Sequence, residues 1–494
     1  MYGNQKGLVF TNDKCIGCNK CISACPVIVA NRAVGTETGI QRIEVDGDKC
    51  IACGACFDAC EHNAREYVDD TEAFFEALSR GEKISVLWAP AFAANYPNEY
   101  RQILGGLKKL GANRIISVSF GADITTWGYI RYITEHNFQG GISQPCPAIV
   151  NYIEHYIPEL IPKLIPVQSP LMCAAIYAKK YLHITDKLAF ISPCIAKKDE
   201  ISDPKNGGYV SYNVTFDHLA KYAKQHSIKA DPAPNEIEYG LGSIYPMPGG
   251  LKENVYWFCG EEVFIRQIEG EKHAYEFLED YKERVLGGKR LPFMVDALNC
   301  AQGCIYGTGV EEEKTRTDDI LYELQAIKEA SKSNRRSSAW ARKATPAQRL
   351  RSLNRQFARL DLRDFMREYT DKSGGNEICK PNQAELNDIF RDMDKINTIQ
   401  QHIDCSACGY DTCTEMATAI FNGCNNKDSC VHYIKNVAER EKEHIQEISY
   451  EVEAKNEEMA RKNEKISEMV SEANGEFTTL NASIGEMIVG NNSN

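Results

Sequence analysis

The spacing of eight cysteines near the N-terminus is the strongest constraint on what this chain can fold into. Cys15, Cys18, Cys21 and Cys25 are separated by two, two and three residues and followed by Pro26, and Cys50, Cys53, Cys56 and Cys60 repeat this spacing. Three thiolates spaced in this way wrap one corner of a 4Fe–4S cluster, while the fourth reaches across to a neighbouring cluster. The pattern therefore predicts two clusters, one held by Cys15, Cys18, Cys21 and Cys60 and one by Cys50, Cys53, Cys56 and Cys25. Zinc sites use isolated CxxC pairs, so zinc is disfavoured here.

Length and composition narrow the class further. A chain of 494 residues is too long for one core and predicts three to four domains. The formal charge of −12 disfavours general binding to nucleic acid or to anionic membranes. No run of 18 apolar residues occurs and the N-terminus lacks the pattern of a signal peptide, so we expect a cytoplasmic protein without a membrane span. In a reducing compartment, 20 cysteines indicate metal ligation rather than disulfides.

The middle of the chain alternates short apolar runs with amphipathic helical patterns. The runs 84–90, 114–120, 188–194 and 292–300 read as buried strands, which predicts an α/β fold with largely parallel sheets. A helical connector, TEAFFEALSRGEK, precedes them. Ligands bind open α/β sheets at the carboxyl ends of the strands. Because Cys194 and Cys300 end two of these runs, we expect them to converge.

Four cysteines in this region suit a third cluster. Cys146 lies between Pro145 and Pro147, which restrict the backbone on both sides and so aim the thiol. Cys300 and Cys304 flank Gly303, where the backbone can come close to a bound group. Three loops thus supply a candidate ligand set: Cys146, Cys194, Cys300 and Cys304.

A last group of cysteines lies near residue 410. Its spacing resembles a small 4Fe–4S domain found in several anaerobic electron-transfer proteins, and its candidate ligands are Cys405, Cys408, Cys413 and Cys430. Four thiolates alone do not identify the metal, so zinc stays open. Cys424 is left over and could exchange roles with Cys430. His402, just before this group, is assigned to the surface.

Two charged segments complete the organisation. Arginines recur every four residues at 351, 355, 359, 363 and 367, which predicts a basic helical arm that docks on the protein's own acidic surface. Apolar residues then recur every seven positions at 445, 452, 459, 466, 473, 480 and 487, which is typical of a left-handed coiled coil. The second seam is poorer, with Lys455 and Lys462 between Ile448 and Met469. A parallel homodimer is preferred to a single solvated helix.

The predicted domains follow from these features. They are a two-cluster ferredoxin-like domain (1–66), a two-lobed α/β domain (80–330), the basic helical arm (331–372), a small helical 4Fe–4S domain (373–434) and a coiled-coil signalling helix (435–494). No output domain follows, so the signalling partner is expected to be a separate protein unless the chain continues.

The motifs resemble known families. The N-terminal repeat is similar to bacterial two-cluster ferredoxins, and SQPCP, SPCIAKKDE and LNCAQGC resemble the three signature loops of the catalytic domain of FeFe hydrogenases. This resemblance covers roughly residues 80–330. It implies an H-cluster, in which a 4Fe–4S cubane on Cys146, Cys194, Cys300 and Cys304 is joined through Cys304 to a di-iron unit carrying CO, cyanide and a dithiolate. It also implies that Lys197 contacts a cyanide ligand and that Glu200 supports the same loop.

The chain departs from that family along the proton path. Pro145 replaces the cysteine that donates protons to the di-iron unit, and Ile165 replaces a serine of the same path. Tyr129 and Tyr132 take the place of glutamates. Methionines beside the cluster become Ser192 and Leu298. General acid–base relays are worth about 10²–10⁴-fold in rate, so slow turnover is expected, as in the sensory branch of the family.

Three functions remain open on the sequence. The first is a hydrogen or redox sensor that exchanges electrons with ferredoxin or another carrier and signals through the helical tail. The second is a catalytically competent ferredoxin-linked hydrogenase, and the third is an electron-transfer protein without the di-iron unit. Among the other cysteines, Cys173 is assigned as a buried thiol, and Cys259 and Cys379 receive no role.

Overall fold

A four-stranded parallel sheet forms one lobe of the central region. In the computed structural model, which describes residues 7–35, 41–233, 240–311, 318–333, 344–376 and 378–491, its strand order is β6-β5-β8-β9. The strands are β5 (Ile84–Trp88), β6 (Ile115–Ser117), β8 (Lys187–Ser192) and β9 (Tyr212–Thr215). β5 and β6 are buried throughout, as continuous apolar runs in a sheet covered on both faces should be. The predicted strands and their parallel pairing are confirmed here.

A second parallel sheet forms the other lobe. Its order is β10-β11-β7, with β7 (Gly141–Ile142), β10 (Ile265–Glu269) and β11 (Met294–Leu298). β11 is the predicted strand before Cys300, and all five of its residues are buried. The α/β fold class predicted from the sequence is therefore confirmed, with two lobes each built on a parallel sheet.

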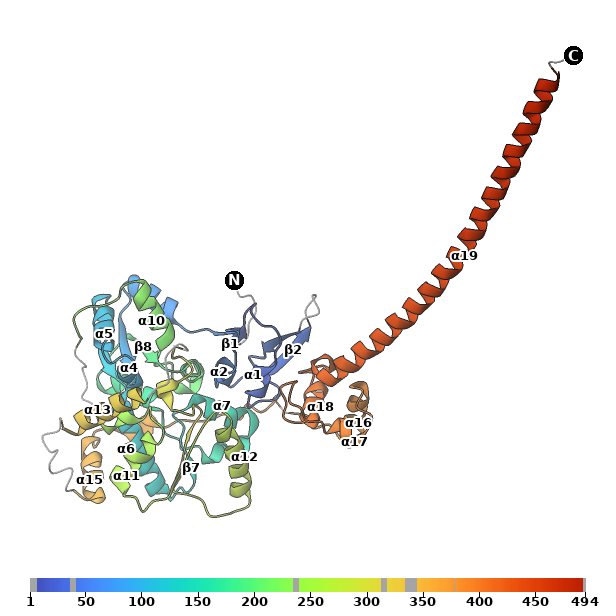
Figure 1. The fold of residues 1–494 in the computed structure, drawn as a ribbon. Coiled ribbons are helices and arrows are strands. Elements are labelled where there is room, and N and C mark those ends of the chain that lie inside the picture. Colours follow the sequence, from blue (N-terminus) through green and yellow to red (C-terminus); the bar gives the residue numbers. More distant parts are fainter. Residues whose placement is uncertain are drawn as a thin grey trace.

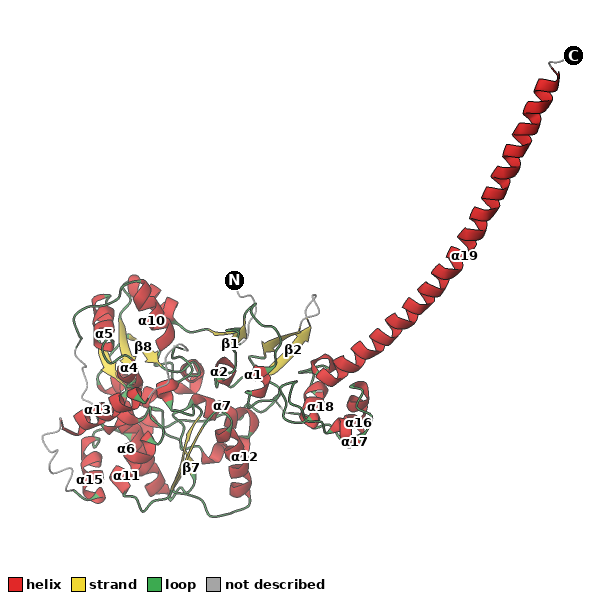
Figure 2. Cartoon of the chain, in the orientation of Figure 1, coloured by secondary structure: helices red, strands yellow, loops and turns green. Residues whose placement is uncertain are grey.

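Helices surround both sheets (Figures 1 and 2). The predicted connector is α3 (Thr71–Ser79). The other helices of this region are α4 (Ala91–Asn95), α5 (Tyr100–Lys109), α6 (Ser119–His136), α7 (Pro147–Tyr156), α8 (Pro170–Ile176), α9 (Lys197–Ser202), α10 (Phe216–Gln225), α11 (Gly250–Cys259), α12 (His273–Leu286) and α13 (Asp319–Ser333).

The N-terminal region is a small antiparallel unit beside these lobes (Figure 1). β1 (Val9–Thr11) pairs with β4 (Arg65–Tyr67), and β2 (Asn31–Gly35) pairs with β3 (Gln41–Val45). Two one-turn helices, α1 (Lys20–Ser23) and α2 (Ala55–Asp58), occupy equivalent places in the two halves of the cysteine repeat. The internal repeat in sequence is thus a repeat in structure.

The prediction that the arginine series lies on one face of a single continuous helix is wrong. α15 (Pro346–Gln356) ends before Phe357, and a 3-10 turn, Leu362–Phe365, follows. The physical reason is the burial of two apolar side chains. Phe357 and Phe365 are almost fully buried, and the chain bends between them to bring both into the core. Arg367 consequently turns inward and is 5% exposed, whereas the four preceding arginines of the series are exposed.

The C-terminal region is helical. α16 (Gln383–Asp392), α17 (Thr398–Gln401) and α18 (Cys413–Phe421) form a small unit beside α1 and β2, and α19 (Val431–Asn491) projects away from the body (Figure 1). α19 has 61 residues and therefore extends about 92 Å. The apolar positions of its seven-residue repeat are exposed, among them Ile445, Met459 and Leu480. No helix in the described ranges combines the length and apolarity needed to cross a membrane.

A buried carboxylate joins the N-terminal unit to the central lobe. Asp69 accepts hydrogen bonds from the backbone N–H and the hydroxyl of Thr215 (2.9 and 2.6 Å) and lies 2.9 Å from Nδ1 of His218. Burial alone would raise the pKa of Asp69, but the contacts with His218 and Thr215 outweigh it and lower that pKa to about 2. Burial likewise would lower the pKa of His218, yet the hydrogen bond and charge of Asp69 raise it above its ordinary value.

We expect Asp69→Asn to lower the free energy of unfolding by about 2 kcal/mol at pH 6, the energy that corresponds to the lowered pKa of Asp69. The ionic part of the contact is complete below the ordinary histidine pKa and is lost as pH rises through the raised pKa of His218. The difference between wild type and variant should therefore shrink by pH 9. Anaerobic denaturant unfolding at both pH values measures it. Glu76→Gln, which removes an exposed helical ion pair with Arg80, is the control; an equal loss for Asp69→Asn at both pH values would contradict the assignment.

Candidate metal centre

The carboxyl ends of the two parallel sheets face one cavity. Its walls come from the segments that directly follow five strands, and they include Pro90 after β5, Val118 after β6, Cys146 after β7, Cys194 after β8 and Cys300 after β11. The space between atoms there, counted together with the open solvent that reaches it, totals about 980 Å³. Parallel strands direct their carboxyl ends to one edge, so two such sheets placed edge to edge enclose a site between them.

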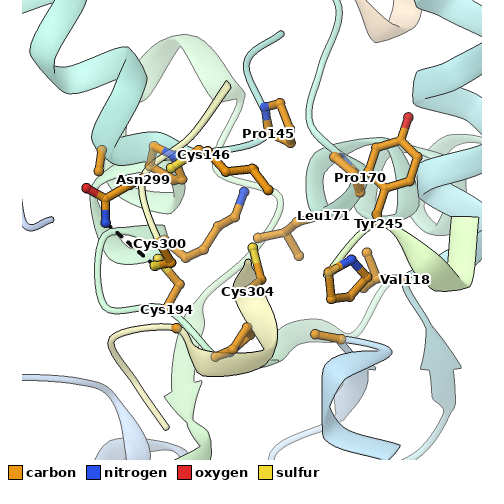
Figure 3. A pocket seen from close by; sticks show the side chains of 18 of the residues that line it. Val118, Pro145, Cys146, Pro170, Leu171, Cys194, Tyr245, Asn299, Cys300 and Cys304 are labelled. Carbon is orange, nitrogen blue, oxygen red and sulfur yellow. Dashed lines mark hydrogen bonds between the residues drawn. The ribbon is translucent and has the colours of Figure 1, made fainter. Parts of the chain in front are cut away.

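All four cysteines predicted to form the third ligand set line this cavity. They are Cys146, Cys194, Cys300 and Cys304, and Lys197 lines it as well. Figure 3 shows the four cysteines around one space with Pro145 beside it. No three His, Cys, Asp or Glu side chains of the described residues gather tightly enough for a single metal ion. The thiols instead surround a space.

Two glycines lie where the backbone approaches another segment too closely for any larger residue. Gly303 has a φ of 74°, in the left-handed region, and a Cβ there would collide with the carbonyl oxygen of Pro246. Gly54 in the N-terminal unit has a φ of 84°, and its Cβ would collide with the side chain of Thr308. The two glycines thus allow the third cysteine loop to lie against the loop of Pro246, and the N-terminal unit to lie against Thr308.

Backbone N–H groups are directed at two of the thiols. Cys146 is the N-cap of α7, and the N–H groups of Ala148 and Ile149 lower the pKa of its thiol. Cys194 lies just before α9, where the N–H groups of Ala196 and Lys197 act in the same way. The first N–H groups of a helix have no partner within it and favour an anion. Both cysteines are therefore placed where a thiolate is stabilised.

Burial nevertheless dominates the electrostatics of the four thiols. It raises the pKa of each, to about 11 for Cys194 and about 12 for Cys304. Neighbouring thiols raise the pKa values of Cys194, Cys300 and Cys304 further, whereas the charge of Lys197 lowers those of Cys146, Cys194 and Cys304. The four cysteines can be ionised together only if a positively charged group lies among them. The iron ions of a cubane supply such charge, so this donor set fits an iron–sulfur cluster.

The N-terminal cysteines separate into two groups. Cys25, Cys50, Cys53 and Cys56 line one cavity, which is the grouping expected for the second cluster, with Cys25 crossing over from the other half of the repeat. Burial raises the pKa of three of these thiols to about 12. Cys15 and Cys18 lie close enough to Cys21 to raise its pKa, although burial is the larger cause.

Cys60 occupies the place in its half that Cys25 occupies in the other. The N–H of Cys25 bonds to the carbonyl of Ile22 after α1, and the N–H of Cys60 bonds to that of Phe57 after α2, both at 3.0 Å. The same local turn thus precedes both cysteines, so the two halves of the repeat place them equivalently.

The C-terminal cysteines also surround a cavity, with Cys430 rather than Cys424 as the fourth member. That cavity is lined by Cys405, Cys408, Cys413 and Cys430. The thiol of Cys424 lies elsewhere, 3.7 Å from the carbonyl oxygen of Val29. Lys395 is buried and donates from Nζ to the sulfur of Cys413 at 3.4 Å. His402 is exposed and bonds to the backbone of Thr398, consistent with a surface role.

Neighbouring cysteine sites are joined by direct contacts. Asn299 donates to the carbonyl oxygen of Cys53 at 2.8 Å and lies 3.6 Å from the sulfur of Cys300, so it connects the second N-terminal site to the central cavity (Figure 3). On the other side, Cys21, Cys413 and Cys430 belong to one apolar cluster. The four sites thus form a contiguous series from the central cavity to the first residue of α19.

The residues expected along a proton path are not all brought together. Tyr129 is fully buried and its hydroxyl accepts from the N–H of Gln144 at 3.0 Å, one residue before Pro145. Burial raises its pKa well above the ordinary value. Tyr132 is outside the cavity lining and stacks on His136. Of the substituted methionine positions, Leu298 lines the cavity, and the hydroxyl of Ser192 bonds within its own loop to the backbone of Cys194.

One acid that the sequence analysis missed does line the cavity. Asp296 in β11 is 2% exposed and accepts a hydrogen bond from the N–H of Lys252 at 3.1 Å. Burial, and to a smaller extent the charge of Glu269, raises its pKa to about 7 against the lowering effect of Lys252. The sequence did offer a signal for this residue, because an acid within a strand predicted to be buried is unusual. Asp296 can therefore hold or release a proton at the cavity wall near neutral pH.

Comparisons with known proteins agree with this division of the chain. Residues 82–308 match the family model of the iron-only hydrogenase large subunit, C-terminal domain. Residues 7–61 match a 4Fe–4S dicluster domain, and residues 401–432 match a model for an Fe–S cluster domain. No curated protein sequence matches the chain.

Solved structures of FeFe hydrogenases are similar to part of the chain. A variant of FeFe-hydrogenase HydA1 from Chlamydomonas reinhardtii has 15% identity and a TM-score of 0.44, covering 61% of this chain and 99% of that one. An FeFe hydrogenase from a structure of oxygen inactivation has 16% identity and a TM-score of 0.45, covering 62% and 100%.

Fold, donor sets and family models together define an iron–sulfur protein with electron-transfer domains. Within residues 82–308 the chain is similar to the iron-only hydrogenase large subunit, C-terminal domain, and this part supplies all four cysteines that line the central cavity together with Lys197.

The C-terminal ligand set can be tested by exchanging its two candidate cysteines. We expect Cys430→Ser to remove about four iron atoms per chain, because Cys430 lines the cavity, and Cys424→Ser to remove none. Iron and acid-labile sulfide analysis after anaerobic reconstitution measures both. Loss of iron from Cys424→Ser alone would reverse the assignment, and loss of about one zinc in place of iron would identify a zinc site.

Proposed function

We propose that this protein is a hydrogen- or redox-responsive sensor with slow hydrogen turnover. One observation carries the proposal: the central cavity keeps the residues suited to bind the reactive group, whereas Pro145 stands where the family has its proton donor. By resemblance, Cys146, Cys194, Cys300 and Cys304 would hold the cubane, and Cys304 would also hold the di-iron unit. When bound, that group supplies the splitting or formation of hydrogen.

The residues of this chain then determine what the group can exchange with its surroundings. Proline has no ionisable proton, and burial raises the pKa of the Tyr129 hydroxyl, which accepts from the N–H of the preceding Gln144, well above its ordinary value. Electrons, in contrast, have a short covalent and hydrogen-bonded route through Asn299 to Cys53. The site is therefore better connected for electrons than for protons, as expected for a sensor.

The series of cysteine sites also supports a signalling output. It ends at Cys430, and α19 begins at the next residue. Arg440 on α19 pairs with Asp394 at 2.8 Å, which ties the base of the helix to the loop beside the C-terminal site. A change of charge at that site would act on the base of α19. We propose that α19 pairs with a second copy of this chain through its exposed seven-residue repeat and passes the change to a signalling partner, with ferredoxin or another carrier exchanging electrons.

A competent hydrogenase is the second candidate, and Asp296 favours it. This acid lines the cavity and has a pKa near 7, so it could replace part of the lost relay. Turnover similar to that of ordinary FeFe hydrogenases would identify this function. An electron-transfer protein without the di-iron unit is the third candidate, and retention of Cys304 and Lys197 argues against it.

Infrared spectroscopy of the anaerobically matured protein tests the proposal directly. We expect CO and cyanide stretching bands that shift reversibly when hydrogen is added and removed. Cys304→Ala, which lacks the proposed bridging thiolate, should show none. Absence of bands in the wild-type protein would mean that the cavity carries only a cubane, and the hydrogen function would fail.

Restoring the proton donor should raise turnover. We expect Pro145→Cys to increase hydrogen production by about 10²-fold, within the range that general acids contribute. Pro147→Cys is the matched control, because it adds a thiol to the same cavity wall on the other side of Cys146. Hydrogen production from a chemical reductant measures both variants. An unchanged rate for Pro145→Cys would place the block further out, where Tyr129 and Ile165 lie.

A further inference from the structure

Three charged side chains are buried together beside the central cavity. Lys197 donates from Nζ to Glu200 Oε2 at 2.5 Å, and Arg367 donates from Nη1 to Glu200 Oε1 at 3.2 Å. The exposed fractions of the side chains are 11% for Lys197, 0% for Glu200 and 3% for Arg367. Buried charges are costly unless they are paired and hydrogen-bonded, so this triad needs a reason to exist.

The triad has an uneven charge. Two cations share one carboxylate, and each cation takes a different oxygen of Glu200. An ion pair of Lys197 and Glu200 without Arg367 would have no net charge, whereas the triad carries one net positive charge. Lys197 is the member that lines the cavity, and its charge is felt by the thiols of Cys146, Cys194 and Cys304. The excess charge therefore faces the site.

Arg367 also reaches the loop that carries the first cysteine. Its Nη1 donates to Gln144 Oε1 at 2.7 Å, and Gln144 is fully buried directly before Pro145. The side-chain amide of Gln144 donates in turn to the carbonyl oxygen of Val167. One guanidinium thus ties the loop of Cys146 to the loop of Lys197.

The segment that holds Arg367 comes from outside the matched hydrogenase domain. Residues 82–308 carry the family match, yet the segment around Arg367 packs against that domain, and the backbone N–H of Arg367 donates to the carbonyl oxygen of Pro166 at 3.2 Å. Met366 bridges to Val167, and Tyr369 donates to the carbonyl oxygen of Ile165 at 2.8 Å. Arg367 is thus held by backbone contacts of Met366 and of its own N–H, and by the side chain of Tyr369 on the other side.

We propose that Arg367 is a positioning residue for the central site. It shares Glu200 with Lys197, so the lysine presents uncompensated positive charge to an anionic group in the cavity, and it fixes the loop of Cys146 through Gln144. The part that concerns the di-iron unit rests on the proposed function, whereas the effect on the cubane does not.

The proposal predicts in which direction each variant shifts the reduction potential of the cubane, which a purely structural role of Arg367 does not. Arg367→Met leaves Lys197 and Glu200 as a neutral pair, Glu200→Gln leaves two cations, and the double variant restores one net positive charge. Less positive charge makes the iron more electron-rich. The cubane reduction potential should therefore fall in Arg367→Met, rise in Glu200→Gln and return towards the wild-type value in the double variant. Arg367→Lys should stay close to wild type.

The experiment uses the full chain in two states. In protein that carries iron–sulfur clusters but no di-iron unit, EPR-monitored redox titration gives the cubane potential, with the cubane signal identified by its loss in Cys194→Ser. In matured protein, the CO stretching bands should move to lower wavenumber in Arg367→Met and to higher wavenumber in Glu200→Gln. Arg363→Met, four residues away on the surface and paired with Asp361, is the control and should change neither.

The outcomes are distinguishable. Potentials unchanged in Arg367→Met and Glu200→Gln would overturn the proposal, as would shifts of the same sign in both. If Arg367→Met fails to fold, Glu200→Gln and the double variant still test the sign, because the proposal requires them to differ. Absence of CO bands in the wild type would refute the di-iron unit, and the cubane potentials would still decide the role of Arg367.

Discussion

The structure depends on one electrostatic problem, which is how to bury thiolates. Burial raises the pKa of every thiol around the central cavity, so the protein must supply positive charge and hydrogen bonds at the same place. Helix N-termini provide part of it at Cys146 and Cys194, and Lys197 provides more. The rest must come from the bound metal. Parallel sheets suit this task because their carboxyl ends bring several loops, each followed by a helix N-terminus, to one edge.

The same requirement explains why the small units pack as they do. A contact that passes electrons between two cluster sites should be short and shielded from water. Asn299 meets both needs between the central cavity and Cys53, since it is 2% exposed and touches groups of both sites. At the far end, the C-terminal unit covers Cys21 with its own apolar residues and cysteines. Each interface between units is thus also an interface between cysteine sites.

The sequence predicted what local spacing and periodicity determine. The four strands, the connector and the α/β class followed from apolar runs, and the cysteine groups followed from spacing. Contacts between segments far apart in the chain could not be predicted from the sequence. The arginine series looked like a helix face, but the buried rings of Phe357 and Phe365 bend the chain and send Arg367 223 residues back to Gln144. The choice of Cys430 over Cys424 likewise depends on tertiary packing, because both thiols are buried.

These features bear on why a site would keep its charges and lose its proton donor. The cavity retains Lys197 and places Glu200 and Arg367 behind it, an arrangement that costs desolvation energy and would be of no use to an empty or purely structural pocket. Pro145 holds the backbone beside Cys146 but offers no proton, and Asp296, the one acid among the described residues that line the wall, lies in β11 rather than in the loop of Cys146. Binding and electron exchange thus remain well supported while proton supply is weak. Under the sensor function that we propose, slow chemistry would keep a bound state long enough for its charge to pass along the cysteine sites to α19, whereas an efficient catalyst would release it.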